Sequence, residues 1–173
     1  MSSKISHSIK ARENPKDVFI TPNKLAIKHI EICQSFSNNN LDKWLDPFKN
    51  SGNYYNNFKT NNKDWCEILQ GIDFFLYNKE TDIICSNPPY SCIDKVLKKS
   101  IELKPKIISY LLAFHGLTTK RMELMEKAGY KIKNIFLTKV YQWYGMSAII
   151  TWVKTSEDSI INYDRTVWRE AKH

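Results

Sequence analysis

Residues 81–114 alternate between apolar runs and an amphipathic segment, and this order constrains the fold more than any other part of the chain. The run TDIIC suits a buried strand, and it leads directly into SNPPY. The segment SCIDKVLKKSIEL (91–103) puts apolar residues on one side of a helix and lysines on the other. KIISYLLAF (106–114) is too apolar for a surface strand and fits a central one. A strand, a helix and a second strand in this order predict a parallel sheet with the helix on its face.

The segments on either side extend this α/β pattern. NKLAIKHIEICQSF (23–36) has a helical apolar face, and Pro22 suits the start of a helix. TTKRMELMEKAGY (118–130) reads as a helix with a threonine cap and Gly129 as its stop. We also expect short strands within 43–48 and 64–69, and a final pair of strands, KIKNIFLTKV and MSAIITWVK, joined by a hairpin at YQWYG. The predicted architecture is α/β: a mostly parallel twisted sheet with helices on both faces and a C-terminal antiparallel hairpin strand.

Length and composition indicate one globular domain. The chain has 173 residues, of which 42% are hydrophobic and 13% aromatic, enough to build a single core. We expect a flexible basic arm at 1–16, a folded domain at 17–154 and a polar tail at 155–173. The net charge of +8 indicates either a polyanionic partner or an ordinary lysine-rich surface. The sequence has no secretory apolar core and no apolar run of about 18 residues, so we expect a cytoplasmic protein that does not cross a membrane.

The cysteines and histidines do not follow a metal-binding spacing. No two cysteines form a C-x-x-C pair, and Cys66 and Cys85 lie in apolar runs where a free thiol behaves as a small hydrophobe. The four histidines are scattered along the chain, and His115 reads as a surface loop residue. We therefore expect buried or incidental thiols in a reducing compartment and no metal site.

The SNPPY stretch predicts a rigid loop at the end of a strand. Two adjacent prolines cannot continue a strand or a helix, because each lacks a backbone N–H and has a fixed φ. In open α/β sheets, ligands bind outside the carboxyl ends of the strands. Polar and aromatic residues follow the predicted strands at this rim: Asp46, Pro47, Phe48, Glu67, Asp73, Phe74, Asn87 and Tyr90.

The spacing of two acidic residues indicates a nucleoside-containing cofactor. Glu67 follows Asp46 by about 20 positions, the separation at which a carboxylate commonly holds ribose hydroxyls. The intervening turn, DPFKNSGN, has one glycine and an acidic start. Such a turn would repel a pyrophosphate and suits a cofactor with a positive centre, as in S-adenosylmethionine.

Five segments, taken in order, resemble the DNA adenine-N6 methyltransferases of the phage and restriction type. SNPPY is similar to their catalytic (D/N)PP(Y/F) motif, and DPFKNSG to their cofactor loop DPFxGxG. FITP resembles their N-terminal motif, and WCEI and GIDFF resemble their second and third cofactor segments. The likeness covers residues 17–153, with NPPY itself shared by cytosine-N4, RNA-adenine and protein-glutamine methyltransferases. It implies a Rossmann-like methyltransferase fold, S-adenosylmethionine as cofactor, and transfer of a methyl group to adenine N6 in DNA, in the cytoplasm of a cell or of a phage or viral host.

The resemblance also implies roles for individual residues. The catalytic set is Asn87, Pro88, Pro89 and Tyr90. Asn87 and the Pro88 carbonyl would accept hydrogen bonds from the target amine, and Tyr90 would stack on the base. The cofactor-binding set is Phe19, Thr21, Pro22, Asp46, Pro47, Phe48, Gly52, Glu67, Asp73, Phe74 and Asn87, with Thr21 equally suited to capping a helix. Asn50 stands where the family usually has glycine, and asparagine accepts left-handed backbone better than most residues.

The sequence alone leaves the substrate and the partners open. A region that recognises a target sequence is not evident, so we expect a nucleic-acid substrate, DNA before RNA, with a homodimer or a partner subunit supplying recognition. Single-stranded DNA or RNA is the other possibility. The alternatives are a protein-glutamine or other amino-methyltransferase and a catalytically weak subunit with a methyltransferase fold. Trp143 and Tyr144 could hold a base or pack within the hairpin.

Overall fold

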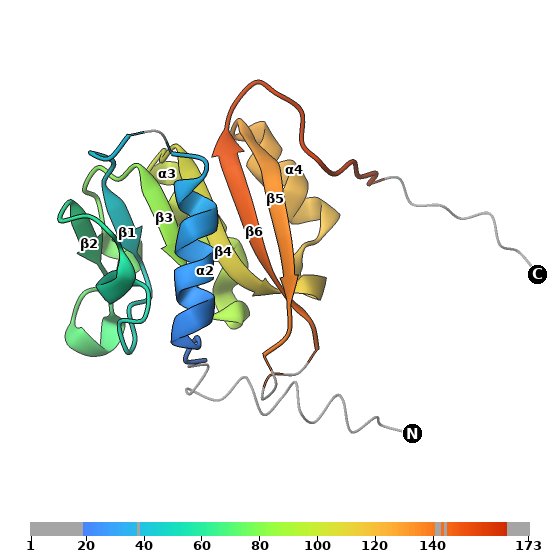
Figure 1. The fold of residues 1–173 in the computed structure, drawn as a ribbon. Helices are drawn as coiled ribbons and strands as arrows, with labels where there is room; N and C mark the ends of the chain where they lie inside the picture. The colour runs from blue at the N-terminus through green and yellow to red at the C-terminus, as the bar shows by residue number, and fades with distance from the viewer. Residues whose placement is uncertain (1–18, 38, 141–142, 144, 166–173) are drawn as a thin grey trace, which may run out of the picture.

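The computed structural model describes residues 19–37, 39–140, 143 and 145–165. Within these residues, α2 precedes the strands β1, β2 and β3, then α3, β4 and α4 follow, and β5 and β6 come last (Figure 1). The elements are α2 Asn23–Gln34, β1 Trp44–Asp46, β2 Lys63–Trp65, β3 Ile83–Ser86, α3 Ile93–Glu102, β4 Ile107–Ala113, α4 Thr119–Lys127, β5 Tyr130–Thr138 and β6 Ser147–Lys154. Short 3-10 turns are η1 Tyr55–Asn57, η2 Ile68–Gln70, η3 Phe74–Leu76, η4 Tyr90–Cys92 and η5 Phe114–Gly116.

The described strands form one six-stranded sheet in the order β2-β1-β3-β4-β6-β5. The pairs β1–β2, β1–β3 and β3–β4 are parallel. Strand β6 lies antiparallel between β4 and β5. This confirms the predicted α/β fold, including the antiparallel strand contributed by the C-terminal hairpin.

Helices cover both faces of the sheet, because successive side chains along each strand point to opposite sides. On one face, α2 packs Ala26, Ile30 and Cys33 against the sheet (Figure 1). On the other face, α3 and α4 cover a larger core. Along β3, for example, Ile83 and Cys85 belong to the α2 side and Ile84 to the α3 side. Strand β4 is buried along its whole length, as its apolar sequence predicts for a central strand.

Local signals set the ends of α4 and β2. Helix α4 begins after Thr118, whose hydroxyl accepts a hydrogen bond from the Arg121 amide, and it is followed by Gly129 at φ 86°. The strand expected within 64–69 is shorter than predicted, since β2 ends at Trp65. The reason is Glu67, whose carboxylate accepts a hydrogen bond from the Leu69 amide and caps η2, so the chain turns there.

The structure describes part of the expected C-terminal tail but none of the expected N-terminal arm. The expected basic arm, 1–16, lies outside the described residues. The expected tail is described up to residue 165, and this part packs on the domain: Ile161 and Tyr163 contact the larger core, and Ser159 bonds to Ile132 and Glu126. Among the described residues, none of the helices has the length and apolar character needed to span a bilayer.

Candidate active site

The side chain of Asn87 is anchored at one end and unsatisfied at the other. Asn87 directly follows β3, and its Nδ2 donates a hydrogen bond of 3.1 Å to the Phe19 carbonyl. That bond identifies the nitrogen, because a carbonyl can only accept. The other amide atom, Oδ1, is buried and has no hydrogen-bond partner among the described residues. A buried acceptor without a partner is costly, which makes Asn87 Oδ1 a candidate acceptor for the donor group of a ligand.

Three aromatic rings, those of Phe19, Tyr90 and Trp143, lie together at the NPPY loop. Tyr90 stacks on Phe19, with ring centroids 5.9 Å apart and planes inclined by 22°. Trp143, from the segment between β5 and β6, meets the edge of Phe19 at 5.5 Å. The structure thus places Trp143 against Phe19, which in turn contacts Tyr90 of the NPPY loop, and a role for Trp143 in holding a base stays a prediction. Tyr144, the other candidate of that hairpin, lies outside the described residues.

Asp46 is buried and organises the loop that follows β1. Its Oδ1 accepts hydrogen bonds from the Ser86 hydroxyl at 2.6 Å and from the Phe48 amide at 3.3 Å. Its Oδ2 accepts from the Tyr55 amide at 3.3 Å. Burial raises the pKa of this carboxyl from 3.8 to about 6, although these three hydrogen bonds favour the charged form. Asp46 therefore connects the cofactor loop to the end of β3, and Pro47 beside it is buried as well.

Asn50 and Glu67 join the loops that follow β1 and β2. Asn50 has a positive φ of 44°, and its amide donates a hydrogen bond of 2.7 Å to Glu67 Oε2. Asparagine thus takes the left-handed conformation expected at this position of the loop. Gly52, two residues later, has φ 87° and donates its amide to the Lys49 carbonyl at 2.6 Å.

Glu67 keeps capacity for a further ligand. Its two oxygens accept one backbone amide each, from Asn50 at 2.7 Å and from Leu69 at 3.1 Å. A carboxylate offers about four acceptor positions, so about two remain. That is the number needed for the two hydroxyls of a ribose.

Phe48 and Phe74 form the wall next to these loops. Their rings meet edge to face with centroids 5.4 Å apart. Asp73 caps η3 by accepting a hydrogen bond of 2.8 Å from the Phe75 amide, and its contact with a cofactor stays a prediction. The turns η2 and η3 also carry large exposed apolar side chains that sequence reasoning missed. Ile68 and Leu69 in η2 are 70% and 85% exposed, and Leu76 in η3 is 79% exposed.

The N-terminal segment lies against both motifs. The Thr21 carbonyl accepts a hydrogen bond of 2.7 Å from the Asn53 side chain in the cofactor loop, while Phe19 reaches Asn87. Pro22 occupies the N-cap of α2, so Thr21 is not the capping residue. The N-terminal segment, the cofactor loop and the NPPY loop are therefore adjacent. His115 is exposed in η5, as expected.

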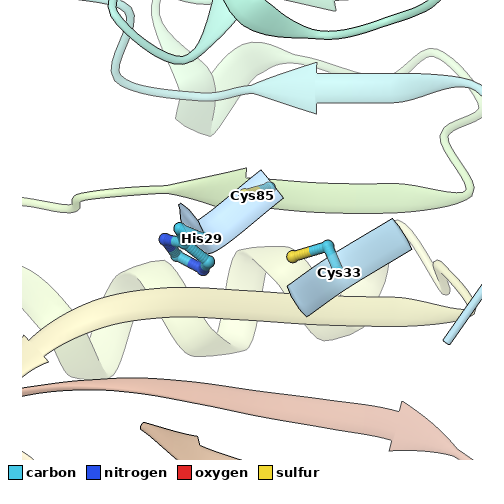
Figure 2. A group of neighbouring side chains, drawn as sticks. All are labelled: His29, Cys33 and Cys85. Carbon is cyan, nitrogen blue, oxygen red and sulfur yellow. The ribbon is translucent and has the colours of Figure 1, made fainter. Parts of the chain in front are cut away.

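The expected burial of the thiols is confirmed for Cys33, Cys66 and Cys85, and the fold adds a grouping that the sequence does not show. The cysteines and histidines are scattered in sequence, but the fold brings His29, Cys33 and Cys85 together beneath α2 (Figure 2). Residues 29 and 33 are one helical turn apart, which the sequence shows, whereas the approach of β3 depends on tertiary packing.

Comparison with known proteins gives a short sequence match. No family model matches the chain. An uncharacterised RNA methyltransferase from Halalkalibacterium halodurans is 35% identical over 63 residues, which are 36% of this chain and 14% of that protein. The chain thus matches about a seventh of the length of this relative.

The fold is shared more widely than the sequence. A proposed RNA methyltransferase from Pyrococcus horikoshii superposes with a TM-score of 0.69 at 15% identity, covering 90% of this chain and 98% of that one. Magnesium protoporphyrin IX methyltransferase from Synechocystis PCC 6803, solved with bound S-adenosylhomocysteine, has a TM-score of 0.56 at 9% identity over 90% and 89% of the two chains. The fold is that of Rossmann-like methyltransferases.

Proposed function

We propose that this protein is an S-adenosylmethionine-dependent methyltransferase that methylates the exocyclic N6 amino group of adenine in a nucleic acid. The observation that carries the proposal is Asn87, whose amide nitrogen is anchored on the Phe19 carbonyl while its buried oxygen lacks a partner among the described residues. An amino group has the two hydrogens that such an acceptor and a neighbouring carbonyl can bind.

The residues of the motif account for activation of the amine. The lone pair of an exocyclic amine is delocalised into the ring, which makes the nitrogen a poor nucleophile. Asn87 Oδ1 and the Pro88 carbonyl accept its two hydrogens and favour a pyramidal nitrogen with an available lone pair. The prolines hold the carbonyl direction before the substrate arrives, which is preorganisation rather than general base catalysis.

The cofactor loop fits S-adenosylmethionine, which when bound supplies a methyl group on a positively charged sulfur. Glu67 has acceptor positions left for ribose hydroxyls, and the Phe48–Phe74 pair offers an apolar wall for an adenine ring. Asn50 adopts the left-handed conformation that the loop requires. The alternative of a catalytically weak subunit has two motivations, Asn50 in the cofactor loop and the lack of an evident recognition region. The left-handed conformation of Asn50 argues against the first and leaves the second in place.

Several features favour a nucleic acid as substrate. The chain carries a net charge of +8, and aromatic rings at Tyr90, Phe19 and Trp143 lie beside the catalytic amide. A base in a duplex must leave the stack before its amine can react, so an unpaired strand is the less costly substrate. The motif resemblance favours DNA, while the proteins from Halalkalibacterium halodurans and Pyrococcus horikoshii, both described as RNA methyltransferases, favour RNA.

The test is a methyl-transfer assay with labelled S-adenosylmethionine and four acceptors: duplex DNA, single-stranded DNA, RNA and a protein extract. Label in N6-methyladenine is the expected result, and the distribution between DNA and RNA identifies the natural polymer. Label found only in glutamine or another protein amine would refute the proposal.

Asn87→Ala is the variant that tests the catalytic assignment in this assay. Removing one preorganised hydrogen-bonding group from a reacting centre typically lowers the rate by about 100-fold or more. We expect such a loss in a single-turnover measurement with saturating cofactor, and a smaller loss of cofactor affinity than Asp46→Ala causes. Asn78→Ala, at an exposed position between η3 and β3, controls for loss of an asparagine elsewhere. Equal rates for Asn87→Ala and the parent would remove Asn87 from the mechanism.

A further inference from the structure

Three soft metal-binding side chains meet in the core between α2 and the sheet. His29 and Cys33 come from α2 and Cys85 from β3, and their ligand atoms all lie within 4.8 Å of one another (Figure 2). All three residues have no exposed surface. The proposed methyl transfer gives none of these side chains a role.

We propose that His29, Cys33 and Cys85 bind a single thiophilic metal ion, of the class represented by Zn²⁺ and Cu⁺. Two cysteine sulfurs and an imidazole nitrogen are the donors that these ions prefer, whereas Mg²⁺ and Ca²⁺ select oxygen. Metal–sulfur and metal–nitrogen bonds of roughly 2.3 and 2.0 Å place neighbouring donors roughly 3.5 Å apart. The observed donors lie within 4.8 Å of one another, so reaching that separation requires them to approach by at most about 1.3 Å.

The hydrogen bonds of His29 indicate how the imidazole can serve as a ligand. Its Nδ1 lies 3.0 Å from the Tyr54 hydroxyl, and its Nε2 lies 2.8 Å from Ser109 Oγ. Ser109 has two further partners, the Thr151 hydroxyl at 2.7 Å and the Ile150 carbonyl at 3.3 Å. Nε2 can therefore be released to a metal without leaving Ser109 unsatisfied. The bond to Tyr54 then orients the ring, as a second hydrogen bond commonly does for a histidine ligand.

Ser109 also places an oxygen beside the group. The sheet register pairs Ser109 with Cys85 on one side and Thr151 on the other, so these residues form a row across β3, β4 and β6 on the α2 face. A Zn²⁺ ion, which favours four ligands, can use this neighbouring hydroxyl as the fourth. A Cu⁺ ion can be satisfied by the three softer donors alone.

A metal here would connect the helix that follows the N-terminal motif to the strand that carries the catalytic motif. Cys85 lies two residues before Asn87, and α2 begins directly after the segment of Phe19 that holds the Asn87 amide. The proposal concerns binding and stability, and its test does not require methyl transfer.

The experiment measures metal content and stability of the full chain, purified reduced and then made metal-free. Because the site is fully buried, Zn²⁺ is supplied both to the folded chain and during refolding. We expect one equivalent of Zn²⁺ per chain by mass spectrometry and a higher melting temperature with Zn²⁺ than with a chelator. Co²⁺ is expected to give a sulfur-to-cobalt charge-transfer band. A parallel titration with Cu⁺ distinguishes the two ions, and stoichiometric binding of either supports the site.

Cys33→Ser and Cys85→Ser test the ligands, and Cys66→Ser is the matched control. Cys66 is equally buried but belongs to the core on the opposite face of the sheet. We expect both ligand variants to lose the equivalent of bound metal and the metal-dependent shift in melting temperature, and Cys66→Ser to keep both. The proposal is overturned if the parent binds no stoichiometric metal, or if Cys66→Ser loses metal as the ligand variants do. Isolation of a Cys33–Cys85 disulfide from a chain that binds no metal when reduced would also overturn it.

Discussion

At the scale of single residues, Asp46 shows how a site residue can have a structural role that its position alone does not reveal. Sequence reasoning places it at the cofactor rim because it ends a strand and starts an acidic loop. In the structure both of its oxygens accept hydrogen bonds, from Ser86, Phe48 and Tyr55. Its carboxylate therefore fixes the loop on the end of β3, and a direct contact between Asp46 and the cofactor stays a prediction.

Asp46 predicts a pH-dependent contribution to stability. Its folded pKa, about 6, is above its ordinary 3.8, so the folded chain binds more protons than the unfolded chain between these values. Stability from this group is therefore lost as the pH rises through that window. Relative to Asp46→Asn, which cannot ionise, the parent should lose about 2 kcal/mol of unfolding free energy between about pH 4.5 and about pH 7. Urea unfolding at the two pH values measures this, and parallel pH profiles for parent and variant would contradict it.

At the scale of elements, the loops that follow β1 and β2 act as one unit. The Asn50 amide binds Glu67, and the Asn53 side chain binds the Thr21 carbonyl. One loop thus contacts both the second cofactor segment and the N-terminal segment. Its conformation depends on two positive φ values, at Asn50 and Gly52.

Gly52→Ala should weaken cofactor binding more than it weakens the fold. An alanine at this position would have to keep φ near 87°, and its Cβ would lie 2.8 Å from Asn56 Nδ2. The left-handed conformation costs an L-residue about 1–2 kcal/mol, so the loop is expected to shift. We expect affinity for S-adenosylmethionine, measured by calorimetry, to fall about tenfold or more.

Gly129→Ala is the control for Gly52→Ala. Gly129 has φ 86°, and a Cβ there meets no atom within 4 Å. It carries the same backbone strain at the end of α4, so it should lower unfolding free energy by a similar amount and leave cofactor affinity unchanged. A matching loss of affinity in Gly129→Ala would show that the Gly52 effect is only general destabilisation.

At the scale of the whole molecule, parallel strand order brings the parts of the site to one edge of the sheet. Strands β1, β2 and β3 run in the same direction, so the residues that follow them meet. The N-terminal end of α2 and the adjoining ends of β5 and β6 lie at this edge as well (Figure 1). This arrangement explains how Phe19, Tyr90 and Trp143, far apart in sequence, form one aromatic group.

The segment after β6 contributes to the stability of the whole domain. Ser159 Oγ accepts a hydrogen bond from the Ile132 amide at 3.1 Å and donates one to Glu126 at 2.9 Å. Ser159→Ala should therefore lower the free energy of unfolding by about 1–2 kcal/mol. Ser156→Ala, at an exposed position in the same segment, should change it by less than about 0.5 kcal/mol. Urea unfolding of the two variants makes the comparison, and equal stabilities would mean that the segment does not support the domain.

The sequence by itself determined the α/β class and the order of the elements, and it predicted the rim at which we expect the site. These properties depend on local information: the period of apolar residues, the prolines of SNPPY, the threonine before α4 and the glycine after it. The left-handed conformation of Asn50 was also predictable from the sequence, because tolerance of this conformation is intrinsic to asparagine. The end of β2 was predicted too far along the chain, because the capping bond from Glu67 is a property of the folded turn.

Only the tertiary structure decided which distant residues meet. The anchoring of Asn87 on Phe19 spans 68 positions, and no periodicity relates the two. The same is true of Trp143 beside Phe19 and of Cys85 beside His29 and Cys33. Such contacts depend on strand register and on how each helix is placed on the sheet. They are fixed when the core packs as a whole, and short-range sequence patterns carry no information about them.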